Sequence, residues 1–78
     1  MDYKELEKLL ITGHDVEFEY NNNKYSILKG PDGFYFSDMQ KKETLKIYSN
    51  IMELLMRTNI NGKKLNDIAK EMKDIRVY

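Results

Sequence analysis

The chain has 78 residues, with no cysteine and a single histidine, and its 13 basic residues balance 13 acidic ones. This length predicts a single domain over residues 1–78, and the missing cysteines exclude a disulfide framework and a thiolate metal site. No apolar stretch reaches the roughly 18 residues of a membrane-spanning helix, and no secretory signal is visible at the polar N-terminus, so we expect a cytoplasmic protein.

A first helix is predicted over residues 3–12. Asp2 precedes it as an N-cap residue, and Glu5 three positions later completes a capping-box pattern. Apolar side chains recur along it at helical spacing, at Tyr3, Leu6, Leu9 and Leu10. Gly13 follows, where helices commonly end in a left-handed residue.

Residues 16–27 predict a β-hairpin, because apolar residues alternate with polar ones on both sides of a run of asparagines. A two-residue turn at residues 22–23 would pair Phe18 with Ile27 and place the apolar side chains on one face. A three-residue loop would instead bury Ser26 and expose Ile27. We expect the two-residue turn, because a slip of one residue moves the whole apolar set to the other face.

The sequence Gly-Pro-Asp-Gly at residues 30–33 predicts a second turn, followed by a strand over residues 34–37. A three-residue loop with a glycine bulge would place Tyr35 on the core face of the sheet. A four-residue loop would place Phe34 and Phe36 on that face and leave Tyr35 outside. Burial favours the four-residue loop, because two phenylalanines bury more apolar area than one tyrosine.

Residues 37–43 are polar and are predicted to form a loop, and a second helix is predicted over residues 44–57. Apolar side chains would cover more than half of its circumference, namely Leu45, Ile47, Tyr48, Ile51, Met52, Leu54 and Leu55. So wide a stripe implies contact on two sides. The sheet would lie on one side, and another helix, a partner protein or a second copy of the chain on the other.

A turn at residues 59–62 leads to a third predicted helix over residues 64–75. The tail at residues 76–78 either frays or adds a short edge strand. The predicted fold class is α+β, with the element order α-β-β-β-α-α. We expect a three-stranded antiparallel sheet with the helices packed on one face, because each helix offers one apolar stripe and the sheet offers one apolar face.

The residue types predict no catalytic site, no cofactor and no metal site. His14 is the only histidine, and at the end of the first helix a partly protonated imidazole suits the negative pole of the helix. Asp15, Glu17 and Glu19 form an acidic row opposite Phe18, but alternate residues on one strand lie about 6.6–7 Å apart, which makes a poor metal site. The row is either a docking strip for a basic partner or a solvated face that keeps an edge strand from pairing.

The two halves of the chain differ in charge. Residues 1–40 carry four basic and eight acidic residues, whereas residues 41–78 carry nine basic and five acidic ones. Such asymmetry indicates either two halves that attract each other or an acidic partner such as nucleic acid. The second and third predicted helices superficially match a helix-turn-helix, with a basic surface of Lys63, Lys64, Lys70 and Lys73. Acidic residues are interspersed among these lysines, so nucleic acid is not the partner that we expect.

A resemblance that covers most of the chain rests on four segments: Phe18-Glu19-Tyr20, Lys24-Tyr25-Ser26-Ile27, Gly33-Phe34-Tyr35-Phe36 and Ile60-Asn61-Gly62-Lys63-Lys64-Leu65. In these segments the chain resembles a group of small uncharacterised proteins encoded in prophages and mobile elements of low-GC Gram-positive bacteria. No activity is established for that group. The resemblance implies an accessory or interaction protein in a bacterial cytoplasm.

We therefore expect a small non-enzymatic binding domain that acts through protein–protein interaction. The partner would be an unidentified protein or a second copy of the chain, and no membrane is involved. The expected partner surface comprises Glu17, Glu19, Tyr35 and the uncovered part of the second helix. The alternative is a nucleic-acid-associated regulator that uses the basic second half.

Overall fold

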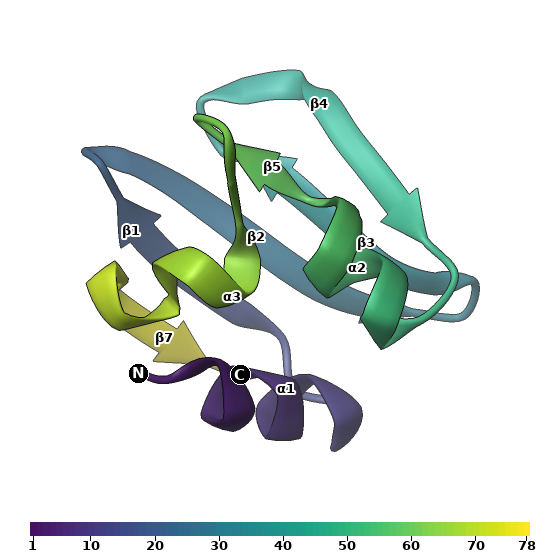
Figure 1. The fold of residues 1–78 in the computed structure, drawn as a ribbon. Helices are drawn as coiled ribbons and strands as arrows, with labels where there is room; N and C mark the ends of the chain where they lie inside the picture. Colours follow the sequence, from purple (N-terminus) through teal and green to yellow (C-terminus); the bar gives the residue numbers. More distant parts are fainter.

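The computed structural model describes the backbone of residues 1–78 and the side chains of residues 1–41 and 45–78. The elements in chain order are α1 (Tyr3–Ile11), β1 (Val16–Tyr20), β2 (Asn23–Gly30), β3 (Gly33–Asp38), β4 (Lys41–Tyr48), α2 (Ile51–Arg57), β5 (Asn59–Ile60), β6 (Lys63–Lys64), α3 (Leu65–Ile68), the 3-10 turn η1 (Ala69–Glu71) and β7 (Lys73–Val77). Three helices and two antiparallel sheets confirm the α+β class (Figure 1).

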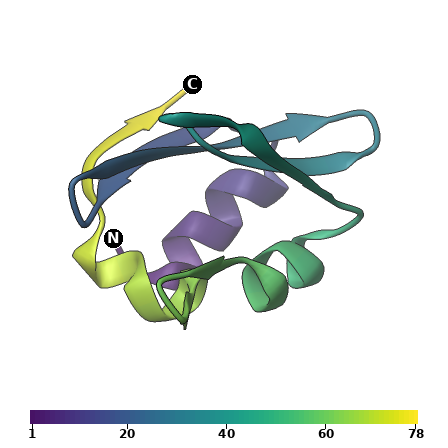
Figure 2. The same ribbon diagram turned by 90° about the horizontal axis from the view of Figure 1, so that it is seen from above.

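The larger sheet has five antiparallel strands in the order β4-β3-β2-β1-β7, and β5 and β6 form a separate two-stranded sheet. The three helices lie on one face of the larger sheet, as expected, and the opposite face is open (Figure 2). We call the open side the outer face. The prediction of three strands was wrong, because β4 and β7 extend the sheet at its two edges.

Helix α1 forms where the sequence predicts it. The carboxylate of Asp2 accepts a hydrogen bond of 2.9 Å from the backbone N–H of Glu5, and Leu6 and Leu10 are fully buried. Gly13 has a φ of +91°, which confirms the left-handed residue after the helix. In the described part of the chain, none of the helices is long and apolar enough to span a membrane.

The core lies between the helices and the inner face of the larger sheet. The buried apolar residues form one cluster: Leu6, Leu10, Val16, Phe18, Tyr25, Ile27, Phe34, Phe36, Tyr48, Leu54, Leu55, Ile60, Leu65, Ile68, Ala69 and Met72. Members from the sheet alternate along their strands, and members from the helices recur at helical spacing, which is the pattern of a two-layer core.

The β1–β2 hairpin has a two-residue turn, but one position earlier than predicted. Asn21 and Asn22 take the two positive φ angles, 52° and 67°, and Phe18 pairs with Tyr25 instead of Ile27. The aromatic rings of Phe18 and Tyr25 stack at 5.4 Å between centroids, which favours this register. Moving the turn by one residue shifts each pairing by two positions, so the predicted apolar set stays on the inner face.

The β2–β3 connection has the pairing that burial favoured, but its turn has two residues instead of four, because Gly30 pairs with Gly33. Lys29 pairs with Phe34, so Phe34 and Phe36 are buried and Tyr35 points to the outer face. Gly33 closes the turn with a φ of +135°, and a Cβ atom there would overlap the carbonyl oxygen of Tyr48. Glycine is therefore the residue that fits both this backbone conformation and this close approach.

The predicted helix over residues 44–57 was wrong in its first half, and so was the predicted loop over residues 37–43. Residues 41–48 form strand β4, which pairs with β3. Helix α2 begins only after Asn50, whose side chain accepts a hydrogen bond of 2.9 Å from the N–H of Glu53. The wide apolar stripe belongs to two elements, so it gives no reason to expect a second copy of the chain.

The predicted helix over residues 64–75 was also wrong for most of its length. Helix α3 covers only Leu65–Ile68 and continues as η1. Residues 73–77 then form β7, which pairs with β1 through Val77 opposite Val16. The edge-strand alternative for the tail is therefore the correct one, with the strand beginning three residues earlier than expected.

Candidate functional site

Three side chains form a row across the outer face of the sheet. Leu28 on β2 pairs with Tyr35 on β3, and Tyr35 pairs with Ile47 on β4. Leu45 lies two residues before Ile47 and so shares its face. Tyr35 is half-buried, whereas Leu28, Leu45 and Ile47 are 39%, 54% and 57% exposed. We call these four residues the outer apolar patch.

The Tyr35 side chain lies against the backbone of a neighbouring strand. A Cβ atom on Gly30 would lie 2.6–2.8 Å from three atoms at the end of the Tyr35 side chain. The ring therefore packs on the bare backbone of Gly30, in the manner by which aromatic residues cover strand glycines. The patch thus has an aromatic residue at its centre, flanked by aliphatic side chains on both neighbouring strands.

The outer face becomes polar on β1 and β7. Ser26 on β2 and Ser37 on β3 share a hydrogen bond of 2.8 Å next to the patch. Ser26 also pairs with Glu17 on β1, so the serines separate the apolar patch from the acidic row. The face therefore runs from an apolar half to a charged half.

The acidic row lies on an internal strand of the sheet, and basic residues lie beside it on the neighbouring strands. Strand β1 lies between β2 and β7, so the prediction that the row protects an exposed edge was wrong. Glu19 pairs with Lys24 on one side and Lys73 on the other, and Glu17 pairs with Arg76. Each of these two carboxylates has a cationic cross-strand neighbour, so the row is one part of a mixed-charge surface.

Two of the acidic side chains also accept hydrogen bonds from other parts of the chain. Asp15 accepts a hydrogen bond of 2.9 Å from the backbone N–H of Lys29, and Glu17 accepts one of 3.1 Å from the Tyr78 hydroxyl. Of the three predicted partner-surface residues, Glu17 and Glu19 thus lie in the charged half of the outer face. Tyr35 lies in the apolar half, on a strand separated from theirs by β2.

His14 is exposed, and its Nδ1 atom lies 2.9 Å from the carbonyl oxygen of Tyr78. The imidazole therefore ties the end of α1 to the C-terminal residue by donating to that carbonyl. Among the described residues, no group of three or more His, Cys, Asp or Glu side chains gathers at one place.

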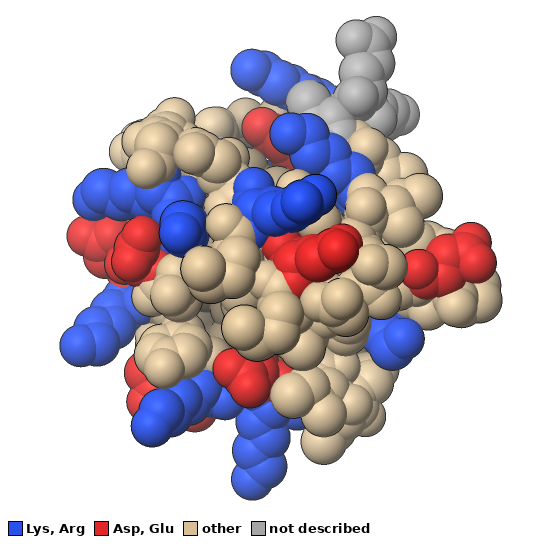
Figure 3. All heavy atoms as spheres, turned by 45° about the vertical axis from the view of Figure 1, so that its right-hand side comes forward, with Lys and Arg blue, Asp and Glu red and all other residues tan. Residues whose placement is uncertain are grey.

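The four lysines proposed for nucleic acid lie in two different layers. Lys63 and Lys64 form β6 in the helix layer, where neighbouring residues of a strand point to opposite sides. Lys73 lies on β7 in the larger sheet, opposite Glu19. Figure 3 shows basic and acidic side chains interspersed over the face in view. The helix-turn-helix interpretation was wrong, because β5 and β6 separate α2 from a four-residue α3.

Sequence reasoning identified one member of the patch, Tyr35, and missed the other three. Leu45 and Ile47 were assigned to the wide apolar stripe of a predicted helix, with the sheet on one side and another helix or a partner on the other. The period-two alternation of residues 45–47 was the signal that could have placed them on a strand, but the helical pattern that follows obscured it. Comparisons of the chain with protein-family models, with curated proteins and with solved structures found no match.

Proposed function

We propose that the chain is a small non-enzymatic binding domain that recognises a protein partner through the outer apolar patch. The observation that carries this proposal is the row of Leu28, Tyr35 and Ile47 across three strands on a face without helices. Large exposed apolar residues are ordinary when they are scattered, but a contiguous group of them on one face is typical of an interaction site.

The surroundings of the patch also match the anatomy of a protein interface. An interface has an apolar centre rich in aromatic residues and a polar rim that stays in contact with water. Here Tyr35 is the aromatic centre, the Ser26–Ser37 pair borders it, and the Glu17–Arg76 pair lies beyond the serines. We infer a partner with an apolar strip for the patch and polar groups for the rim.

An accessory role of this kind is also what the resemblance to small prophage-encoded proteins implies. The nucleic-acid alternative has less support, because Lys63 and Lys73 lie in different layers and acidic residues lie among the basic ones. Affinity for nonspecific duplex DNA across a salt series separates the two functions, since phosphate contacts impose a steep salt dependence. We expect no such dependence.

The proposal is tested by capturing partners with the immobilised chain from cells that express it naturally. The variant Ile47→Glu places a charge in the patch, and Met52→Glu places one on α2 at a residue of similar exposure, 60% against 57%. Both side chains are exposed, so each variant should fold with a stability within about 1 kcal/mol of the original.

We expect a protein that the original chain and Met52→Glu capture equally, and that Ile47→Glu loses. Light scattering on the same variants shows whether a second copy of the chain is that protein. Equal capture by Ile47→Glu and the original chain would contradict the proposal, and so would loss of capture by Met52→Glu alone.

A further inference from the structure

Strand β4 forms one edge of the larger sheet, and its last part is regular. Residues 46–48 pair with residues 34–36 of β3 in one continuous register. The opposite edge of the sheet is irregular, because Asp74 on β7 has a φ of +50° and the register shifts between Glu17 and Glu19 of β1. Irregularities of this kind keep an edge strand from pairing with another chain. The end of β4 is therefore the part of the sheet edge that fits a further strand.

The backbone of Ile47 directs its hydrogen-bonding groups away from the sheet. The two glycines that flank the turn between β2 and β3 pair with each other, and the closing pair of a two-residue turn is hydrogen-bonded. Bonded and non-bonded pairs alternate from there, so Tyr35 bonds to β2 and its two neighbours on β3 bond to β4. The bond of 2.8 Å from the Met39 N–H to the Lys24 carbonyl has the phase that this alternation requires. Ile47 lies opposite Tyr35, so its N–H and C=O point to the free edge.

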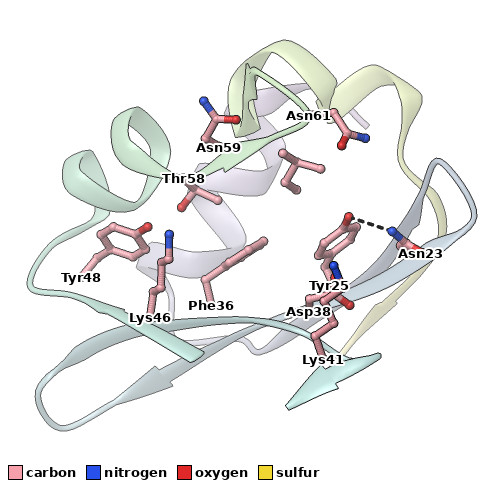
Figure 4. A pocket seen from close by; sticks show the side chains of 11 residues that line it. Asn23, Tyr25, Phe36, Asp38, Lys41, Lys46, Tyr48, Thr58, Asn59 and Asn61 are labelled. Atoms are coloured by element: carbon pink, nitrogen blue, oxygen red, sulfur yellow. Dashed lines mark hydrogen bonds between the residues drawn. The ribbon is translucent and has the colours of Figure 1, made fainter. Parts of the chain in front are cut away.

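The side chains around this backbone differ between the two faces of the sheet. On the outer face, Leu45 and Ile47 are the members of the outer apolar patch that lie at the edge. On the inner face, Lys46 is exposed and lies at a pocket of about 260 Å³ between strands β2–β4 and residues 58–61. Figure 4 shows its side chain directed from β4 toward Thr58. A strand added at this edge would thus meet apolar side chains on one face and a lysine on the other.

The charge of Lys46 decides which kind of strand fits. Lysine at a sheet edge is a common means by which proteins disfavour pairing between identical edges. If two copies paired antiparallel across Ile47, their two Lys46 side chains would come near each other on the same face. An acidic residue opposite Lys46 instead makes a favourable cross-strand pair with it. The edge therefore favours an acidic strand from another protein over a second copy of the chain.

We propose that the end of β4 pairs with an extended segment of the protein partner, in which apolar and acidic residues alternate. The apolar side chains of the segment extend the outer apolar patch beside Ile47, and an acidic side chain lies opposite Lys46 on the inner face. The backbone N–H and C=O of Ile47 gain hydrogen bonds to the added strand. This inference rests on the proposed function, because the outer apolar patch supplies one of the two faces, and it adds the backbone pairing and the charge of the partner.

The test is a titration of the 15N-labelled chain with the synthetic peptide Thr-Val-Glu-Val-Glu-Val-Thr. We expect a dissociation constant of about 1 mM or lower and slower hydrogen exchange of the Ile47 amide in the complex. The amides of Lys46 and Tyr48 are already bonded to β3 in the free chain, so their exchange should change little. A peptide with lysine in place of glutamate has the same alternation and should bind about tenfold more weakly. Unchanged exchange of Ile47 at saturation would overturn the proposal.

Two variants of Ile47 separate backbone pairing from contact with the outer apolar patch. Ile47→Ala and Ile47→Pro both remove the isoleucine side chain, but only proline also removes the N–H. Because this N–H points away from the sheet, proline fits the position as it does on natural edge strands. Ile47→Pro should bind the glutamate peptide about tenfold more weakly than Ile47→Ala does. Should Ile47→Pro not fold, the exchange of the Ile47 amide and the charge variants below decide.

Charge variants test the acidic character of the segment. Lys46→Glu should reverse the preference, so that the lysine peptide binds more tightly than the glutamate peptide. Lys70→Glu changes an exposed lysine of η1 and should keep the original preference. Equal binding by Ile47→Pro and Ile47→Ala, or an unchanged preference in Lys46→Glu, would overturn the proposal. A partner that contacts only the side chains of the patch would still be lost by Ile47→Glu in the capture experiment, so the proposed function fails or stands separately.

Discussion

Single residues fix the geometry of the outer face. Gly30 leaves room for the Tyr35 ring, and Gly33 lets the turn between β2 and β3 pass close to the backbone of Tyr48. Both glycines matter because they have no Cβ atom, but a Cβ atom would meet a different kind of neighbour at each position. A Cβ at Gly30 meets the end of a side chain that can turn away, whereas one at Gly33 meets a backbone carbonyl that cannot.

Gly33→Ala should therefore destabilise the fold strongly. We expect a loss of about 3 kcal/mol in the free energy of unfolding, because the substitution adds steric overlap to an unfavourable φ. Gly13→Ala is the matched control, since its φ is +91° but nothing lies within 4 Å of the added Cβ. The control should lose only about 1–2 kcal/mol. Urea denaturation measures both, and equal losses would show that the overlap at Gly33 is relieved at no cost.

At the scale of elements, local signals predicted what local interactions decide. Asp2 and Gly13 bound α1 through contacts within a few residues, and alternation around Phe18 shows which side of the hairpin is apolar. The burial of two phenylalanines correctly placed Tyr35 outside. Each of these inferences needed only neighbours in sequence, which a single chain does show.

The errors lie where distant strands decide the structure. Residues 73–77 become a strand because they complete the hydrogen bonding of β1, more than fifty residues earlier in the chain. Residues 45–48 become a strand because β3 pairs with them, although the apolar residues that follow extend a helical pattern. Tertiary context overrides local preference at both places. The same override hid Leu45 and Ile47, half of the candidate site.

The start of α2 can be tested directly. Asn50→Ala removes the side chain that accepts from the N–H of Glu53, and it should lower the free energy of unfolding by about 1 kcal/mol. The exposed Met52→Ala lies within the same helix and should change it by less than about 0.5 kcal/mol. Thermal or urea unfolding is the measurement. If Asn50→Ala is as neutral as Met52→Ala, the helix does not begin there.

On the scale of the whole molecule, the two faces of the larger sheet carry different side chains. The inner face carries the core and, at its β4 end, the pocket near Thr58. The outer face carries the apolar patch and a mixed-charge half. The strand order accounts for the charge asymmetry of the sequence, because acidic residues of β1 pair with basic residues of β7. The two halves of the chain thus meet with opposite charges at the sheet, as one of the two sequence interpretations requires.

The central claim is that the outer face, and not the helix layer, meets the partner. A photoreactive benzoylphenylalanine in place of Tyr35 tests it directly, because its aromatic side chain lies at the centre of the patch, and the same group in place of Met52 reports on the helix layer. After irradiation in cells that express the protein naturally, the account predicts a covalent protein adduct from position 35 and none from position 52. An adduct from position 52 alone, or no adduct from position 35, would contradict it.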